Sequence, residues 1–171
     1  MNVSKKLVIG ALCTALCVAL PMAFHAVGMG SMFLPMHIPV LICGLVCGWP
    51  YGLVCGLLGP FLSSFTGMPP LAMLPGMMVE CATYGAASGL GMQIVRTGSM
   101  YADLYISMIA AMLLGRVVYG LVNAYILMSG QSLTAWAAAS FVTALPGILI
   151  QLIVIPTLIV TLTRAKLIPA R

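Results

Sequence analysis

Charged residues are scarce in this sequence. Lysine, arginine, aspartate and glutamate together make up 5% of the 171 residues, and Glu80 and Asp103 are the only acidic residues. Hydrophobic residues make up 63% of the chain, and the mean hydropathy is +1.18. So few charges cannot cover the surface of a water-soluble domain. The composition therefore predicts a protein whose solvent is the lipid bilayer.

Clusters of basic residues and the motifs of common enzymes are also missing. A nucleic-acid-binding face needs lysines and arginines gathered on one surface, and the sequence has no such cluster. It has no GxxxxGK[ST] phosphate loop, no HExxH or GxSxG motif, and no group of acids able to hold Mg²⁺ for phosphoryl transfer. We therefore expect no nucleic-acid partner, no catalytic residue and no cofactor in this chain.

The six cysteines lie in apolar runs and do not form a metal-binding pattern. Cys13 and Cys17 are four residues apart, as are Cys43 and Cys47, but no histidine or carboxylate is near enough in sequence to complete a tetrahedral set. The spacing is also unlike that of a secreted disulfide framework. We expect no metal, and we interpret the cysteines and the fourteen methionines as adaptable apolar packing, with a minor role for some methionines in lining a pocket.

Proline, glycine and polar residues divide the chain into six apolar segments. We expect membrane-spanning helices at about residues 6–24, 33–48, 52–67, 70–95, 102–128 and 136–163, within one membrane domain over residues 1–171. The first is interpreted as a retained span and not as a signal peptide. A helix needs about 20 residues to cross the hydrocarbon core, so the second and third segments are short.

The short second and third segments are separated by a predicted tight turn, Gly48-Trp-Pro-Tyr-Gly52. The same five residues, Gly-Leu-Val-Cys-Gly, flank this turn on both sides, beginning at Gly44 and at Gly52. Small residues at such spacing let two helix backbones approach closely. We therefore expect these two segments to pack as a helical hairpin.

Basic residues at the ends of the segments support the count of six spans. Those outside the spans are Lys5, Lys6, Arg96, Arg164, Lys166 and Arg171. With six spans they all fall on one side, and the loops on the opposite side carry neither lysine nor arginine, which is the positive-inside pattern. The sequence thus predicts an all-α integral membrane protein, a six-transmembrane-helix bundle with both termini cytoplasmic.

Two charged residues are predicted well inside the spans, far from their ends: Glu80 in the fourth and Arg116 in the fifth. Each would cost about 2.5–3.5 kcal/mol at the bilayer centre, so exposure to lipid is disfavoured. Glu80 lies about ten residues, or roughly 15 Å, from the outer start of its span, and Arg116 about twelve residues, or roughly 18 Å, from the outer end of the next. Adjacent antiparallel helices can bring them to similar depths, so a pair is feasible.

Polar side chains follow helical spacing on one face of each of the last three spans. The fourth span carries Glu80, Tyr84 and Ser88; the fifth carries Arg116, Tyr119 and Asn123; the sixth carries Ser140, Thr143, Gly147 and Gln151. Three polar faces favour a ligand site over an isolated structural pair. The predicted ligand-binding residues are Glu80, Tyr84, Arg116, Tyr119, Asn123, Ser140, Thr143 and His37, where His37 has an equal claim to a purely structural role.

Alanine recurs every four residues along the first span, at Ala11, Ala15, Ala19 and Ala23. This spacing gives a smooth face along which another helix can approach closely, so we interpret Ala11, Ala15 and Ala19 as a surface for coupling to a partner protein. At 17.9 kDa the chain is small for a self-sufficient transporter built of inverted repeats. A ligand-binding subunit energised by its partners is the economical interpretation.

These features together resemble the substrate-binding S component of an energy-coupling factor (ECF) vitamin transporter. The resemblance covers essentially the whole chain and rests on the small-residue face of the first span and on the stretches Leu34–Gly44, Gly48–Gly52, Gly67–Pro70, Glu80–Gly85 and Gly115–Gly120. It implies an outward-facing pocket built mainly from helices four to six and capped by the first outer loop. It also implies that the alanine face meets a transmembrane coupling protein, driven by two cytoplasmic ATPases, in a bacterial plasma membrane.

The main hypothesis is a high-affinity binding subunit of an ATP-driven importer for a water-soluble vitamin or cofactor precursor. Pantothenate would suit Arg116, because guanidinium forms bidentate contacts with a carboxylate. A pyridoxine-like or α-ribazole-like ring would suit the combination of Glu80 and Arg116 with Tyr84 and Tyr119. The alternatives are a structural or accessory membrane protein in which a Glu80–Arg116 pair fixes helix packing and, less favoured, an intramembrane enzyme that uses Glu80 as acid or base.

Overall fold

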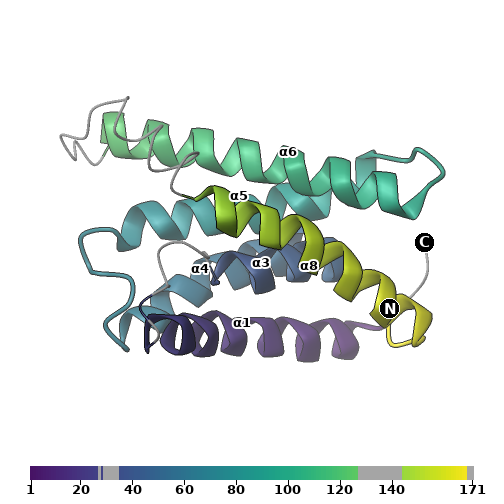
Figure 1. The fold of residues 1–171 in the computed structure, drawn as a ribbon, viewed down its shortest axis with the longest axis horizontal. Coiled ribbons are helices and arrows are strands. Elements are labelled where there is room, and N and C mark those ends of the chain that lie inside the picture. The colour runs from purple at the N-terminus through teal and green to yellow at the C-terminus, as the bar shows by residue number, and fades with distance from the viewer. Residues whose placement is uncertain (27, 29–34, 127–143, 169–171) are drawn as a thin grey trace.

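The computed structural model describes residues 1–26, 28, 35–126 and 144–168. This part of the chain consists of helices joined by turns and loops and contains no β-strand, which confirms the all-α class. In chain order the elements are α1 (Val3–Ala26), α3 (His37–Cys47), α4 (Trp49–Ser64), α5 (Leu74–Ile94), α6 (Met100–Leu121), the short π-helix η1 (Val122–Ile126) and α8 (Leu145–Arg164) (Figure 1).

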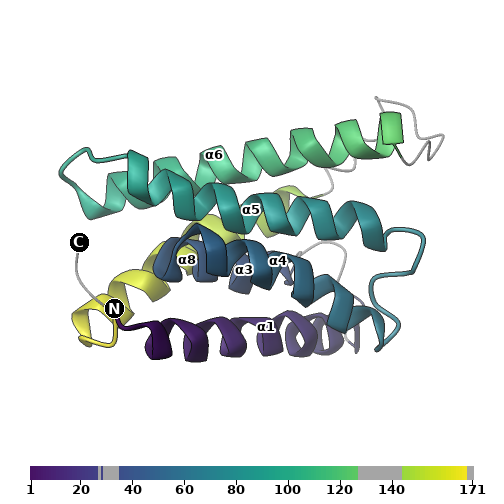
Figure 2. The same ribbon diagram turned by 180° about the vertical axis from the view of Figure 1, so that it is seen from behind.

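Helix α5 occupies the centre of the packing. It contacts α3, α4 and α6, while α1 packs against α3 and α4 on the other side. In both views of the ribbon, α1 and α6 form opposite sides of the bundle, and α5 lies next to α6 (Figures 1 and 2). The fourth predicted span, which carries Glu80, is therefore enclosed by α3, α4 and α6, while α3 contacts α1, α4, α5, α6 and α8.

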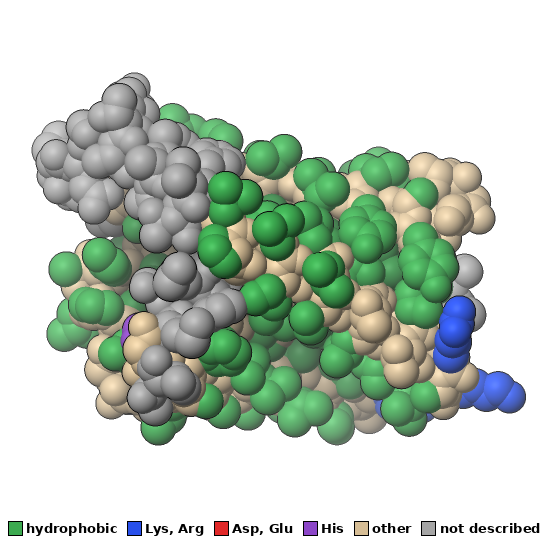
Figure 3. All heavy atoms as spheres, in the orientation of Figure 1, with side chains coloured by type: hydrophobic (Ala, Val, Ile, Leu, Met, Phe, Trp, Pro, Cys, Tyr) green, Lys and Arg blue, Asp and Glu red, His purple; other side chains and the backbone are tan. Residues whose placement is uncertain are grey.

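Three of the described helices are long and apolar enough to cross a membrane: Val3–His25, Met100–Ala124 and Leu145–Arg164. Helix α3 is apolar but has only 11 residues, or about 16 Å, roughly half of the hydrocarbon thickness. Three of the six predicted spans thus have the length and hydropathy of a membrane-crossing helix, and the other three remain a prediction. On the face shown in Figure 3, apolar side chains cover most of the surface along the helices.

Basic side chains gather at one end of the bundle. Lys5 and Lys6 lie at the start of α1, Arg96 lies between α5 and α6, and Arg164 and Lys166 lie at the end of α8. The start of α1, the end of α8 and the α5–α6 connection lie at this same end, and Figure 3 shows lysine and arginine side chains there. Among the described residues, the cations outside the spans therefore share one side, as the sequence predicted.

Helices α3 and α4 are separated by one residue, Gly48, so the predicted turn over Gly48–Gly52 is wrong in its extent. Gly48 has a φ of 97°, a conformation that glycine adopts without steric penalty, and it suffices to break the helix. Pro50 then lies in the first turn of α4. Backbone N–H groups there have no acceptor within the helix, so the N–H that proline lacks costs no helical hydrogen bond. Trp49, Pro50 and Tyr51 are consequently helical.

Glycines hold α3, α4 and α5 in close approach. A methyl group added at Gly52 would overlap the Gly85 carbonyl of α5 and would lie 2.7 Å from the Gly44 Cα of α3. At Gly56 it would overlap the backbone of Cys81. The repeated Gly-Leu-Val-Cys-Gly sequence does serve close packing, as predicted, but its glycines bring both helices of the hairpin against α5 as well as against each other.

The two faces of α1 differ in environment. Cys13 and Cys17 are buried, and Cys17 Sγ lies 3.7 Å from the Met36 carbonyl oxygen that precedes α3. Ala11, Ala15 and Ala19 are exposed. All six cysteines are buried and free. Helix α1 therefore attaches to the bundle through its cysteine face and leaves the alanine face open.

Replacing Gly52 by alanine should destabilise the protein by about 1–3 kcal/mol, because the added methyl group forces α4 and α5 apart. Gly10→Ala is the matched control, since its methyl group would meet only Cys43 Sγ, at 4.0 Å. Alanine favours a helix by about 0.5–1 kcal/mol over glycine, so this control should keep or raise stability. The midpoint of thermal unfolding in detergent, followed by circular dichroism, measures both variants. Equal midpoints would contradict the packing argument.

Candidate functional site

A carboxylate, a phenol and an imidazole meet inside the bundle. Glu80 of α5 is 7% exposed, and the Tyr84 hydroxyl, one helical turn further along, donates a hydrogen bond of 2.8 Å to Glu80 Oε1. His37, the first residue of α3, places Nε2 3.8 Å from the same oxygen. Its ring packs edge-on against that of Tyr84 with centroids 5.0 Å apart. The i, i+4 spacing of Glu80 and Tyr84, recognised in the sequence, thus places these two side chains in contact on one face of α5.

His37 has polar atoms with no partner. Its side chain is buried, and neither Nδ1 nor Nε2 has a hydrogen bond among the described residues. A buried polar group left without a partner costs about 1–3 kcal/mol, so buried groups are almost always satisfied. Nε2 faces Glu80 at a distance too long for a hydrogen bond, which leaves Nδ1 as the atom most open to a bound molecule.

Arg116 of α6 is buried close to this group. It is 6% exposed, and its neighbour Gly115 packs against the Tyr84 ring, where an added methyl group would lie 2.5 Å from the ring carbons. The Arg116 charge acts on Glu80, yet the two side chains do not form an ion pair within 4.0 Å; in the described structure the nitrogen that comes within this distance of Glu80 Oε1 is His37 Nε2, at 3.8 Å. The direct Glu80–Arg116 pair that the sequence made feasible is therefore not formed.

The Arg116 side chain also contributes an unpartnered atom, since its Nε is buried without a hydrogen bond among the described residues. Further along the same face, Tyr119 and Asn123 both pack against Gly76 of α5, where an added methyl group would lie 2.9 Å from the tyrosine ring and 3.2 Å from the amide nitrogen. Asn123 donates to the Tyr119 carbonyl at 3.1 Å. The predicted polar face of the fifth span thus turns toward α5.

The remaining predicted residues divide into two groups. Ser140 and Thr143 lie outside the described residues, as does most of the first outer loop that was expected to cap the pocket. Ser88 is buried and packs against Gly44 of α3, so it serves the glycine contact and not the polar group around Glu80. Gly147 and Gln151, from the stripe predicted in the sixth span, are buried in α8.

A cavity of about 330 Å³ adjoins His37. It lies between the end of α1, the start of α3, the connection between α4 and α5, and the first turn of α5, at the end of the bundle away from the lysines. Its walls are four methionines, four prolines and two histidines: Met36, Met68, Met73, Met77, Pro21, Pro35, Pro69, Pro70, His25 and His37. The walls of the cavity are therefore mostly apolar and polarisable, and one of them includes the His37 imidazole, which faces Glu80.

Most of these lining residues were missed from the sequence. The available signal was the density of methionine and proline over Met68–Met77, since methionine fills irregular gaps and adapts to bound molecules. Most of these positions lie in the connection between α4 and α5 and not on a regular helix face, so helical spacing could not select them. Within the described part of the chain, no three His, Cys, Asp or Glu side chains gather in a way that could hold a metal ion.

Comparison with known families gives one match. A family model described as "ECF transporter, substrate-specific component" matches residues 5–159, which is most of the chain and includes α3 to α6 in full. Comparison with curated proteins and with solved structures gives no match.

Replacing Tyr84 by phenylalanine should destabilise the protein by about 1.5–3 kcal/mol, because it removes a buried hydrogen bond to a carboxylate. The ring, its contact with Gly115 and its contact with His37 are retained, so the change isolates the hydroxyl group. Tyr105→Phe on the exposed side of α6 is the control and should leave stability unchanged. The readout is the thermal unfolding midpoint of the two purified variants. An unchanged midpoint for Tyr84→Phe would argue against the Tyr84–Glu80 contact.

Proposed function

Because the chain belongs to the family of ECF transporter substrate-specific components, we propose that it is the high-affinity binding subunit of an ATP-driven importer for a water-soluble vitamin or cofactor precursor. Members of this family are substrate-binding transport subunits and not enzymes. The observation that carries the proposal is His37, a buried imidazole with unpartnered nitrogens that lies between Glu80 and an apolar cavity. A ligand in the cavity can supply the missing hydrogen bond.

The lining of the cavity favours a flat, uncharged ring as the ligand. Thioethers such as those of Met36, Met73 and Met77 make favourable contacts with aromatic rings. The volume of about 330 Å³ is at the small end of ligand pockets, which hold about 300–1,000 Å³. A pyridoxine-like or α-ribazole-like heterocycle fits this environment, with a ring heteroatom or hydroxyl group hydrogen-bonded to His37.

Pantothenate fits less well. Its carboxylate would need a bidentate cation, but neither lysine nor arginine is among the described residues that line the cavity. Arg116 is buried next to Gly115, which packs against the Tyr84 ring, and its charge acts on Glu80. In this proposal Arg116 balances the charge of Glu80, and both stay in place whether or not a ligand is bound.

Transport then depends on partner proteins. The family works with an ECF module, and the exposed alanine face of α1 is the surface we propose for contact with its transmembrane coupling protein. Ala11, Ala15 and Ala19 present no side chain beyond a methyl group, so a partner helix can approach closely. Two cytoplasmic ATPases supply the energy, in a bacterial plasma membrane, with both termini of this chain on the cytoplasmic side.

Calorimetric titration of the purified protein with a panel of vitamins and precursors tests the ligand assignment. One aromatic heterocycle should bind tightly, and His37→Phe should weaken it by about tenfold, since one hydrogen bond contributes about 1–1.5 kcal/mol. The phenylalanine keeps a ring against Tyr84, and Arg96→Gln, remote from the cavity, should bind as the wild type does. Tight binding of pantothenate that Arg116→Met abolishes would overturn the ring assignment.

Ala15→Trp tests the coupling face. In cells that contain a complete ECF module, this variant should lose uptake while the purified protein keeps its ligand affinity, because the bulky ring separates α1 from the partner helix. Ile153→Trp on α8, where the native side chain is 66% exposed, is the control and should affect neither property. Normal uptake by Ala15→Trp would exclude this face, and loss of binding together with uptake would indicate damage to the fold.

A further inference from the structure

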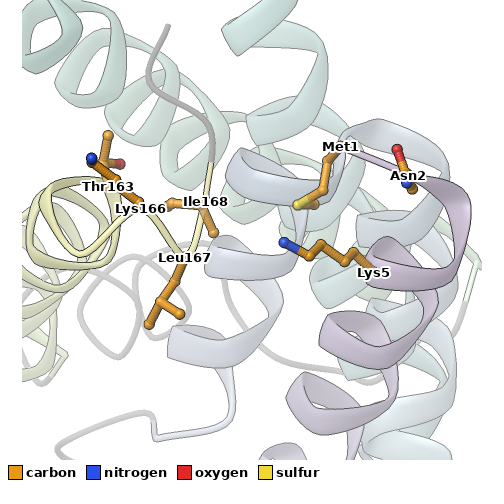
Figure 4. A pocket seen from close by; sticks show the side chains of 7 residues that line it. All are labelled: Met1, Asn2, Lys5, Thr163, Lys166, Leu167 and Ile168. Carbon is orange, nitrogen blue, oxygen red and sulfur yellow. The ribbon is translucent and has the colours of Figure 1, made fainter.

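A second hollow lies at the basic end of the bundle, between the start of α1 and the turn that follows α8. Its volume is about 380 Å³, and the polar side chains that line it are Asn2, Lys5, Thr163 and Lys166. Figure 4 shows Lys5 extending its ammonium group from α1 toward Ile168, with Thr163 and Lys166 on the other wall. No acidic side chain is among the described residues that line it. The hollow therefore offers two positive charges, an amide and a hydroxyl group to an anion.

The backbone after α8 is shaped around this hollow. Lys166 has a φ of 57° and is the only described residue other than glycine with a positive φ. Its position just after the helix is one that glycine usually occupies, because the conformation is unfavourable for residues with a side chain. The turn is closed by the Leu167 N–H, which donates to the Leu162 carbonyl at 3.0 Å, and it leaves Ile168 buried. This local fold sets Lys166 at the rim of the hollow.

An apolar groove of about 510 Å³ continues from the hollow along the bundle. The two share Lys5, Leu167 and Ile168 as lining residues, so they adjoin at these three side chains. The groove runs between α1, α3 and α8, and its walls include Val8, Leu12, Leu16, Ile42, Leu158 and Leu162. A cationic hollow thus lies next to a groove that suits a hydrocarbon chain.

We propose that the hollow and the groove together bind one anionic phospholipid, with its phosphate between Lys5 and Lys166 and one acyl chain in the groove. The geometry distinguishes this lipid from those that cover any hydrocarbon surface, because the groove ends at Lys5 and adjoins the hollow that also holds Lys166. Basic pockets between membrane helices on the cytoplasmic side are suited to acidic headgroups. A zwitterionic lipid carries its own ammonium group and gains less from the two lysines.

Native mass spectrometry of the full chain tests the proposal. The protein, purified in detergent, is offered equal amounts of dioleoylphosphatidylglycerol and dioleoylphosphatidylcholine, and the wild type should retain one phosphatidylglycerol in preference. Each lysine near an anionic lipid contributes about a fivefold preference, so Lys5→Gln with Lys166→Gln should lower the ratio of the two bound lipids at least about fivefold. An unchanged ratio would overturn the proposal.

Lys6→Gln is the matched control, since Lys6 is the next residue, and its Nζ lies 5.5 Å from the centroid of the Tyr51 ring, away from the hollow. It should keep the wild-type ratio, whereas an equal loss would show that only the total charge matters. Leu12→Trp fills the groove at an exposed position and should reduce retention of phosphatidylglycerol. Full retention in that variant, or displacement of the lipid by millimolar glycerol phosphate, would show that the acyl chain is not bound there.

Discussion

The contact between the α4 and α5 backbones at Gly52 and Gly85 determines where the polar residues of this bundle lie. With no side chain between them, the two helices approach until backbone meets backbone, and α3 is drawn against the same surface through Gly44. Since α5 carries Glu80 and α3 begins at His37, this approach brings the carboxylate and the imidazole together. A larger residue at these glycines would move the start of α3 away from α5, and the polar group would lose its geometry.

A polar group inside an apolar bundle needs partners, and the structure supplies them unevenly. Glu80 has the Tyr84 hydroxyl, the His37 ring and the charge of Arg116 nearby. His37 and Arg116, in contrast, keep nitrogen atoms without hydrogen bonds among the described residues. A carboxylate with hydrogen-bond donors beside nitrogens that lack partners is an arrangement expected of a binding site, because a bound ligand can supply the missing hydrogen bonds. A purely structural polar cluster would be expected to satisfy its own members.

Local spacing explains what the sequence could predict. The helical class, the shared face of Glu80 and Tyr84, and the face of Arg116, Tyr119 and Asn123 all follow from residues within two or three turns of one helix. The contact between Glu80 and His37 joins positions 43 residues apart, and it depends on where α3 begins. The positions of the residues along their predicted spans instead suggested Arg116 as the partner of Glu80. The Met68–Met77 wall lies largely in a connection between helices, where no periodic pattern marks the lining residues.

The late start of α3 has an electrostatic consequence. The N-terminus of an α-helix carries a partial positive charge of about half an elementary charge, which arises from its unpaired N–H groups. Because α3 begins at His37, this end of the helix lies close to the buried Glu80 inside the bundle. Peptide dipoles therefore share with Arg116 the stabilisation of the buried carboxylate. In the proposed site, a ligand could therefore enter and leave without the separation of a direct Glu80–Arg116 ion pair.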